Sequence, residues 1–176
     1  MQISILILCL IINVNFNESH KIEELDTTEK KEGFLEHIFE VDQSLRKGES
    51  SQIILTHGID SEEYKNFIEN SLIQDSINLN NIEKYLNLYG YPKKSIFSQT
   101  AVYTPWTIIH HSMSYKRKKE NFHWLKDAYL ERNIEGSSFS MYLERMYSMK
   151  FKKRPDYQEL GDKELIEKLI NDLEFK

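Results

Sequence analysis

Three polar residues of this 176-residue sequence, Asp42, Arg46 and His111, have the types needed for acid–base or anion-binding chemistry. Asp42 and Arg46 are four residues apart, so on a helix they share one face. As an exposed ion pair they would contribute only about 0.3–0.5 kcal/mol. If the pair is buried and faces His111, Asp42 would orient an imidazole that can act as general acid or base, and Arg46 or Arg145 would hold an anionic group. His111 and Asp42 are therefore the candidate catalytic residues, although satisfied polar networks in a protein core use the same residue types.

The other histidines and the single cysteine form no metal-binding motif. His37 and Glu40 are three residues apart and could bind a metal from one helix face, but metal-binding bundles use two such sets, and the sequence has no second one. His110 and His111 are adjacent, which on a helix points them about 100° apart. Cys9 lies in an apolar N-terminal stretch, so the rest of the chain has no cysteine for a disulfide, a zinc site or a thiol nucleophile. We expect no metal and no cofactor.

Positive charge is concentrated in two runs, residues 116–119 and 150–154. The chain as a whole carries a net charge of −5, which does not favour binding to nucleic acid, and no such partner is expected. We expect the runs to be solvated helix ends, where cations complement the helix dipole. The alternative is a partner rich in phosphate, which would be nucleic acid if the chain is cytosolic and a lipid headgroup or cell-wall polymer if it is exported.

The elements that must position these residues are helices, because glycine and proline are scarce and apolar residues recur at helical spacing. The sequence predicts an all-α fold, a compact bundle of six or seven helices. Residues 52–56 form either one short strand-like segment or a buried connection. Separate helices are expected around residues 61–72 and 79–89, and the helix that contains Pro105 begins near either Ser98 or Thr104. The residues expected to face the core include Phe34, Leu86, Leu125 and Leu143.

The N-terminal segment, residues 1–17, is predicted to be a signal peptide or an N-terminal membrane anchor. Its apolar run of about twelve residues matches the hydrophobic region of a signal peptide and is shorter than the roughly 20 residues of a membrane span. Lipidation at Cys9 is a lesser alternative, because Leu8 is larger than the residue that usually precedes a lipoprotein cysteine. A buried N-terminal element and a misassigned start also stay open. Residues 18–32 are expected to be a polar spacer and residues 33–176 a single helical domain.

Four segments, taken in order, carry a family resemblance: EVDQSLR at 40–46, YGYP at 89–92, residues 101–112 with Trp106 and His111, and MYLER at 141–145. Together they resemble a bacterial domain-of-unknown-function family, the one numbered six-six-two-four, over roughly residues 34–157. The resemblance implies a mostly helical domain and no known reaction. Its motifs make Gln43, Arg46, Trp106 and Arg145 the candidate ligand-binding residues.

The sequence departs from the family's pattern in three places. Tyr91 stands where the family has tryptophan, and His110 stands where it has glutamine. The family's terminal Y-G-T-Q motif has only a poor counterpart in residues 154–158. If that motif builds a site in the family, this chain lacks the site.

The leading functional hypothesis is a non-catalytic binding or interaction domain of the cell envelope, exported or anchored close to a membrane, for instance in the periplasm. It would be cytoplasmic if the apolar start is misassigned. One alternative is a small hydrolase-like enzyme that uses His111 and Asp42. The other is a phosphate-polymer binder that uses residues 116–119 and 150–154.

Overall fold

The computed structural model describes residues 22–157 and 160–175, and within these ranges all regular secondary structure is helical, without a strand. A short 3-10 helix, η2 (Ile22–Glu24), precedes eight α-helices. These are α1 (Thr28–Ser44), α2 (Glu49–His57), α3 (Glu62–Tyr89), α4 (Gln99–His111), α5 (Tyr115–Glu120), α6 (Phe122–Leu130), α7 (Gly136–Phe151) and α8 (Asp162–Leu173). Only Asn121 separates α5 from α6, so the two form one interrupted segment and the bundle has seven helical segments on that basis. The predicted all-α class is confirmed.

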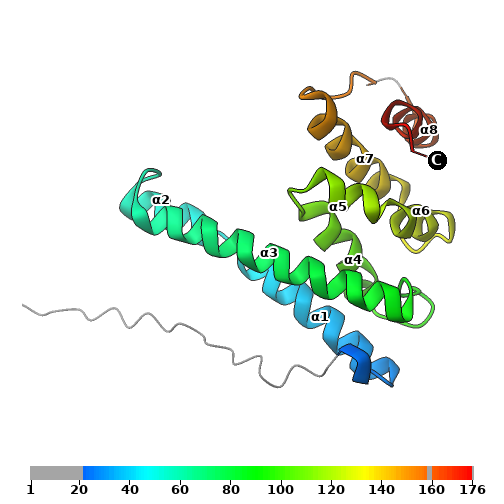
Figure 1. Ribbon diagram of the computed structural model, residues 1–176, viewed down its shortest axis with the longest axis horizontal. Coiled ribbons are helices and arrows are strands. Elements are labelled where there is room, and N and C mark those ends of the chain that lie inside the picture. The colour runs from blue at the N-terminus through cyan, green and yellow to red at the C-terminus, as the bar shows by residue number, and fades with distance from the viewer. Residues whose placement is uncertain (1–21, 158–159, 176) are drawn as a thin grey trace, which may run out of the picture.

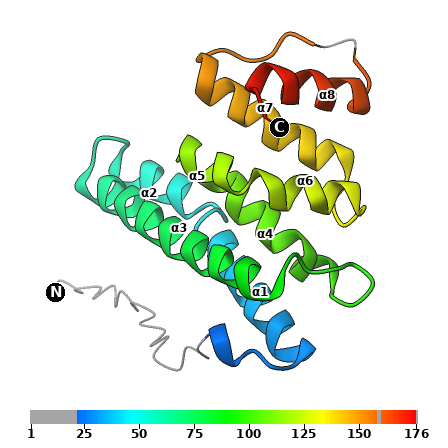
Figure 2. The ribbon, with the colours of Figure 1, turned by 45° about the vertical axis from the view of Figure 1, so that its right-hand side comes forward.

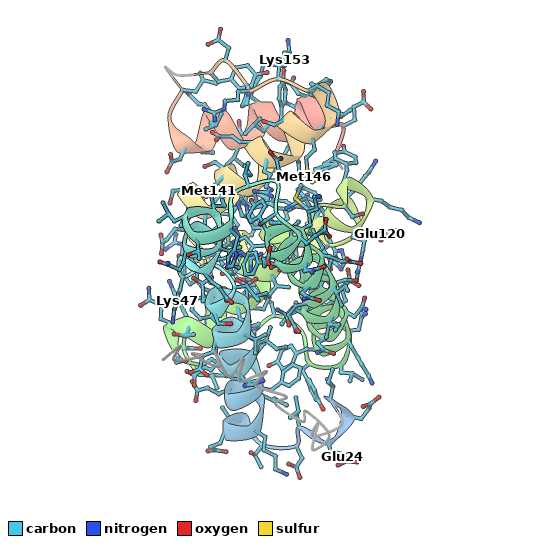
Figure 3. All side chains as sticks on the ribbon, turned by 90° about the vertical axis from the view of Figure 1, so that its left-hand side faces the viewer. Glu24, Lys47, Glu120, Met141, Met146 and Lys153 are labelled. Atoms are coloured by element: carbon cyan, nitrogen blue, oxygen red, sulfur yellow. The ribbon has the colours of Figure 1, made fainter. Side chains whose placement is uncertain are left out.

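The helices form an elongated molecule in which α4 joins the two ends (Figure 1). Helices α1 and α3 lie side by side, α2 folds back on the start of α3, and α4 packs against both α1 and α3 (Figure 2). Beyond α4, helices α5 and α6 contact α7, which in turn packs against α8. Glu24 and Lys153 lie near opposite ends of the molecule (Figure 3). This order places the ends of α1 and α4 beside each other near the middle of the molecule.

The core runs the length of the bundle and is built from the predicted apolar faces. Leu86, Leu125 and Leu143 are fully buried, and Phe34 packs on the core with its ring stacked 5.9 Å from that of Tyr85. Near the other end, the ring of Phe122 contacts that of Phe175 at 4.4 Å. The expectation that these helical stripes pack together is therefore confirmed.

The first helix begins earlier than expected, because part of the predicted polar spacer belongs to it. The Thr27 hydroxyl accepts a hydrogen bond from the backbone N–H of Lys30 at 3.2 Å and caps the helix, which starts at Thr28. Ile22 and Leu25 are buried as well. The first turns of this helix are exposed and carry charged residues, so apolar spacing gave no signal for its true start. The predicted segment 1–17, with Cys9, lies outside the described residues.

Both alternatives for residues 52–56, a strand-like segment and a buried connection, are wrong, since these residues belong to α2, which has no buried residue. The amide of Gln52 donates to the Thr56 hydroxyl at 3.2 Å, a pairing of positions i and i+4 that only a helix allows. β-branched side chains disfavour a helix by only some tenths of a kcal/mol each. With no second strand in the described chain to pair with, helix formation is the outcome that satisfies the backbone.

The two helices expected around 61–72 and 79–89 are one 28-residue helix, α3. Residues 73–78 between the two apolar stripes contain neither glycine nor proline, so nothing interrupts the backbone. The end of α3 at Tyr89 agrees with the predicted bound, and Gly90, which follows it, has a φ of 74°, a value that favours glycine.

Helix α4 begins at the earlier of the two expected positions. The Ser98 hydroxyl accepts from the N–H of Ala101 at 3.3 Å, so Pro105 lies inside the helix. One turn along, the Thr104 hydroxyl donates to the carbonyls of Thr100, at 2.8 Å, and of Leu35, at 3.1 Å. This contact ties α4 to α1. Among the residues that the structure describes, no helix has the length and hydropathy of a membrane span.

Candidate functional site

A buried carboxylate, Asp42, is the centre of the polar cluster where the ends of α1 and α4 meet. Its side chain is 1% exposed. Both carboxylate oxygens lie 3.0 Å from Nδ1 of His111, and the Arg46 guanidinium lies 2.9 Å from Oδ1. The Gln43 amide donates to Oδ2 at 2.9 Å. A buried charge is tolerated when it is paired and hydrogen-bonded in this way.

Arg46 links α1 to α3 instead of facing outward for a ligand. Its guanidinium donates to the Asp42 backbone carbonyl at 2.8 Å and to both carboxylate oxygens of Asp75 on α3, at 2.9 and 3.0 Å. The structure thus brings Asp42, Arg46 and His111 together and buries the carboxylate. This agrees with the predicted buried pair that faces His111, not with an exposed ion pair. Because two carboxylates already engage Arg46, its predicted role in holding an anion has no support in the geometry.

His111 is fixed by Asp42 in a definite orientation. A proton on Nδ1 satisfies the carboxylate, and in the neutral ring this leaves the lone pair on Nε2. The side chain is 23% exposed and lines an open hollow between α1 and α4. In chemical terms, Nε2 can accept a hydrogen bond from a ligand or take a proton from it.

This hollow, which we call the α1/α4 hollow, has a volume of about 410 Å³. Its lining consists of three aromatic rings together with amide, hydroxyl and imidazole groups: Phe39, Gln43, Gln99, Thr100, Tyr103, Trp106, Thr107 and His111. None of these side chains is a carboxylate, a lysine or an arginine. Such a lining combines large apolar area with a few orienting polar groups, as small-molecule sites do.

Trp106, predicted as a ligand-binding residue, forms a fixed wall of the α1/α4 hollow. Its indole N–H donates to the backbone carbonyl of Ser138 at 2.8 Å. Its ring stacks on His110 with the centroids 5.0 Å apart and the planes at 18°. Burial lowers the pKa of His110 to about 3, with the positive charges of Lys118 and Arg145 as further causes, so the ring against Trp106 is neutral.

Arg145 lies elsewhere, and its predicted place in the Asp42 cluster is corrected by the structure. It lines a second hollow of about 320 Å³, formed by the end of α4, by α7 and by the segment after α7. The described residues give it one hydrogen-bond acceptor, the Met113 sulfur at 3.4 Å. Arg145 is therefore on the His110 side of α4, whereas Asp42 is on the His111 side.

The basic runs are less available to a partner than the sequence suggests. Arg117 forms a short ion pair with Glu83 and also donates to Asn80 at 2.8 Å. Lys118 is fully buried, and its amine donates to the carbonyls of Ile109 and His110 at 2.9 and 2.5 Å. Lys150 contacts the carboxylate of Glu174 at 3.5 Å. The expectation of solvated helix ends is wrong for Lys118, and these contacts count against a phosphate polymer as partner.

Sequence reasoning missed Lys118 and most of the lining of the α1/α4 hollow. The signal for Lys118 was its spacing of three from Tyr115 and four from Phe122, which places it on the inner face of a helix. The signal for the hollow was the series 99, 103, 106 in α4, again at helical spacing. In the part of the chain that the structure describes, no three His, Cys, Asp or Glu residues gather as metal ligands would.

No protein-family model, curated protein or solved structure matches the chain. The resemblance to the family of unknown function therefore stays a prediction.

Proposed function

We propose that this chain is a non-catalytic binding domain that takes a small, uncharged, polar molecule with a flat face in the α1/α4 hollow. The observation that carries the proposal is the lining of that hollow, in which aromatic rings adjoin Gln43 and His111. Aromatic faces of this kind stack on sugar rings and on other flat ligands. The amide and the imidazole would then fix the orientation of the ligand through hydrogen bonds.

The polar end of the hollow is preorganised, which supports binding. Asp42 holds both Gln43 and His111; Arg46 pairs with Asp42 and is itself held by Asp75. Polar groups that are already fixed lose little conformational freedom when a ligand binds. A charged ligand is disfavoured, because no lining side chain supplies an opposite full charge.

A titration with neutral oligosaccharides and with phenol, followed by ¹H–¹⁵N NMR on the full chain, tests the proposal. Tyr103→Ala removes one aromatic wall and should weaken binding about three- to ten-fold, the equivalent of about 0.5–1.5 kcal/mol for a lost ring contact. The matched control is Tyr64→Ala, since Tyr64 is another half-buried tyrosine, on the distant start of α3. Equal weakening by the two variants, or no saturable shift with any probe, would overturn the proposal.

Placement in the cell envelope is the other part of the proposal and rests on the predicted segment 1–17. Sequencing the N-terminus of the native protein after cell fractionation tests it. A mature N-terminus within residues 15–25 in an envelope fraction would support export. An intact Met1 in the cytosol would rule it out.

A hydrolase-like activity is the second candidate, and one observation favours it: His111 is held by a buried carboxylate through Nδ1, as in many catalytic pairs. No serine or threonine hydroxyl in the described chain bonds to His111, so the imidazole would have to activate water. Turnover of 4-nitrophenyl acetate that is lost in His111→Gln but kept in His123→Gln, an exposed histidine, would favour the enzyme. Equal turnover by both variants would leave binding as the function.

A further inference from the structure

The second hollow, which we call the Arg145/Arg154 hollow, is lined by His110 of α4, whereas the proposed ligand site is lined by His111. Arg145 comes from α7, and Arg154 from the segment that follows it. Both side chains line one space of about 320 Å³. Two guanidinium groups of separate origin therefore converge on a space large enough for a small molecule.

Neither guanidinium is neutralised by a bonded carboxylate in the described part of the chain. Arg46 and Arg117 provide the contrast, because each of them is bound by acidic side chains. Arg145 has only the weak acceptor Met113 Sδ, and Arg154 is exposed with no hydrogen bond or ion pair there. Guanidinium donors that lack an internal acceptor are free to meet an external one.

The surroundings keep the hollow positive. Lys118 lies behind it, with its amine on the carbonyl of His110, and His110 itself is neutral. The charges of Lys118 and Arg145 oppose each other, which contributes to the lowered pKa of Lys118. Glu144 is the one carboxylate in the lining and offsets one of the two arginines. The lining thus keeps one net positive charge.

We propose that the Arg145/Arg154 hollow binds a phosphate group, either free or as a small monoester. The planar guanidinium fork matches a phosphate with two parallel hydrogen bonds, and arginine is the residue best suited to this contact. The Ser148 hydroxyl lines the same space and supplies a neutral donor. Met141 and Pro155 provide an apolar margin for the organic part of an ester. This site is separate from the α1/α4 hollow and does not depend on the function proposed for it.

Calorimetric titrations of the full chain with inorganic phosphate and with phenyl phosphate, at an ionic strength held constant with chloride, test the inference. Arg145→Gln and Arg154→Gln should each weaken binding about ten-fold or more, the usual effect of losing a charge-assisted hydrogen bond. Lys153→Gln is the matched control, because it makes the same change in charge one residue away on an exposed side chain near the end of the molecule (Figure 3). It should change the affinity less than two-fold.

Glu144→Gln gives a test with the opposite sign. It removes the negative charge from the lining and should therefore tighten phosphate binding. If Glu144 had only a structural role, the substitution would not increase the affinity for phosphate. Phosphate binding as tight as that of phenyl phosphate identifies the free ion as sufficient, and tighter binding of phenyl phosphate identifies a monoester. Both results support the site.

Three outcomes would overturn the proposal. The first is that Lys153→Gln and Arg154→Gln weaken phosphate binding equally. The second is that the Glu144→Gln protein binds phosphate more weakly than the unchanged chain. The third is that neither ligand gives a saturable heat. If circular dichroism shows that Arg145→Gln does not fold, Arg154→Gln carries the test alone, since Arg154 is exposed and makes no hydrogen bond to the rest of the described chain.

Discussion

Lys118 is an ionisable residue inside the protein, and its amine bonds to no carboxylate among the described residues. Its amine donates to the last carbonyls of α4, and its own backbone carbonyl accepts a hydrogen bond from the Tyr142 hydroxyl at 2.7 Å. The carbonyls at a helix C-terminus carry partial negative charge and stabilise a cation there. From within α5, Lys118 thus caps the last turn of α4 and accepts a hydrogen bond from α7.

The buried amine makes the stability of the protein depend on pH. Burial lowers the pKa of Lys118 to about 7, and the charge of Arg145 contributes. In the unfolded chain a lysine has a pKa near 10.4, so between about pH 7 and pH 10 the unfolded chain binds more protons at Lys118 than the folded chain does. The contribution of Lys118 to the free energy of unfolding therefore rises with pH across this window. The slope should approach about 1.4 kcal/mol per pH unit. Above pH 10 the buried Tyr85 and Tyr142, whose pKa values are raised by burial, reverse the trend.

Urea unfolding at pH 7.5, 8.5 and 9.5 checks this prediction. Lys118→Met should remove the rise in unfolding free energy with pH, and the exposed Lys119→Met should keep it. An unchanged slope in Lys118→Met would show that another group is responsible.

At the scale of single residues, the i and i+4 spacing predicted the pairing of Asp42 with Arg46, whereas His111 was joined to them only through the motifs of the family resemblance. The sequence could not place Arg145. The turn between α4 and α5 decides which side of α4 meets α7, and that geometry depends on packing around the buried Lys118. A spacing argument holds within one helix and gives no information across two.

At the scale of elements, the all-α fold class and most of the buried helix faces could be predicted from apolar periodicity. The first and last residues of each helix depended instead on single residues. Gly90 and Ser98 are strong local signals, and both end or begin a helix as expected. No glycine or proline interrupts α3, so the two apolar stripes that predicted separate helices belong to one continuous helix. In α2 the β-branched residues suggested a strand because no tertiary information was available to oppose them.

Two glycines on the helices provide a matched test of backbone conformation. Gly90 has φ 74° and ψ −175°, a combination open to glycine alone, and Gly33 lies within α1 with no atom close to its position. Gly90→Ala should lower the free energy of unfolding by about 1–3 kcal/mol. Gly33→Ala should raise it by roughly 0.5–1 kcal/mol, because alanine favours a helix. Neither site has a steric neighbour, so unfolding curves that show equal effects of both changes would contradict this account.

At the scale of the whole molecule, the core is unevenly distributed along α3. Leu72 in the first half of α3 is 51% exposed, while Leu86 near its end is fully buried, and α2 has no buried residue. The end of the bundle formed by α2 and the start of α3 therefore has little packing to stabilise it. Local opening should occur there first, because regions with few buried contacts open at low free energy.

Two leucines of α3 test this distribution directly. Leu86→Ala should cost about 2–5 kcal/mol, as in other cores. Leu72→Ala should change stability by less than about 0.5 kcal/mol. Hydrogen exchange should also be faster in α2 than in α7. A large loss of stability in Leu72→Ala would mean that this face is covered.

Because Trp106 lines the α1/α4 hollow, its fluorescence can report on the binding of a ligand there. The sequence has two tryptophans, and Trp124 belongs to α6, away from the α1/α4 hollow. In a Trp124→Phe background, all indole fluorescence would come from a ring whose one face is covered by His110 and whose side chain lines the hollow. Any molecule that enters would displace water from that indole and shift its emission, so candidate ligands could be screened by light alone, without a label.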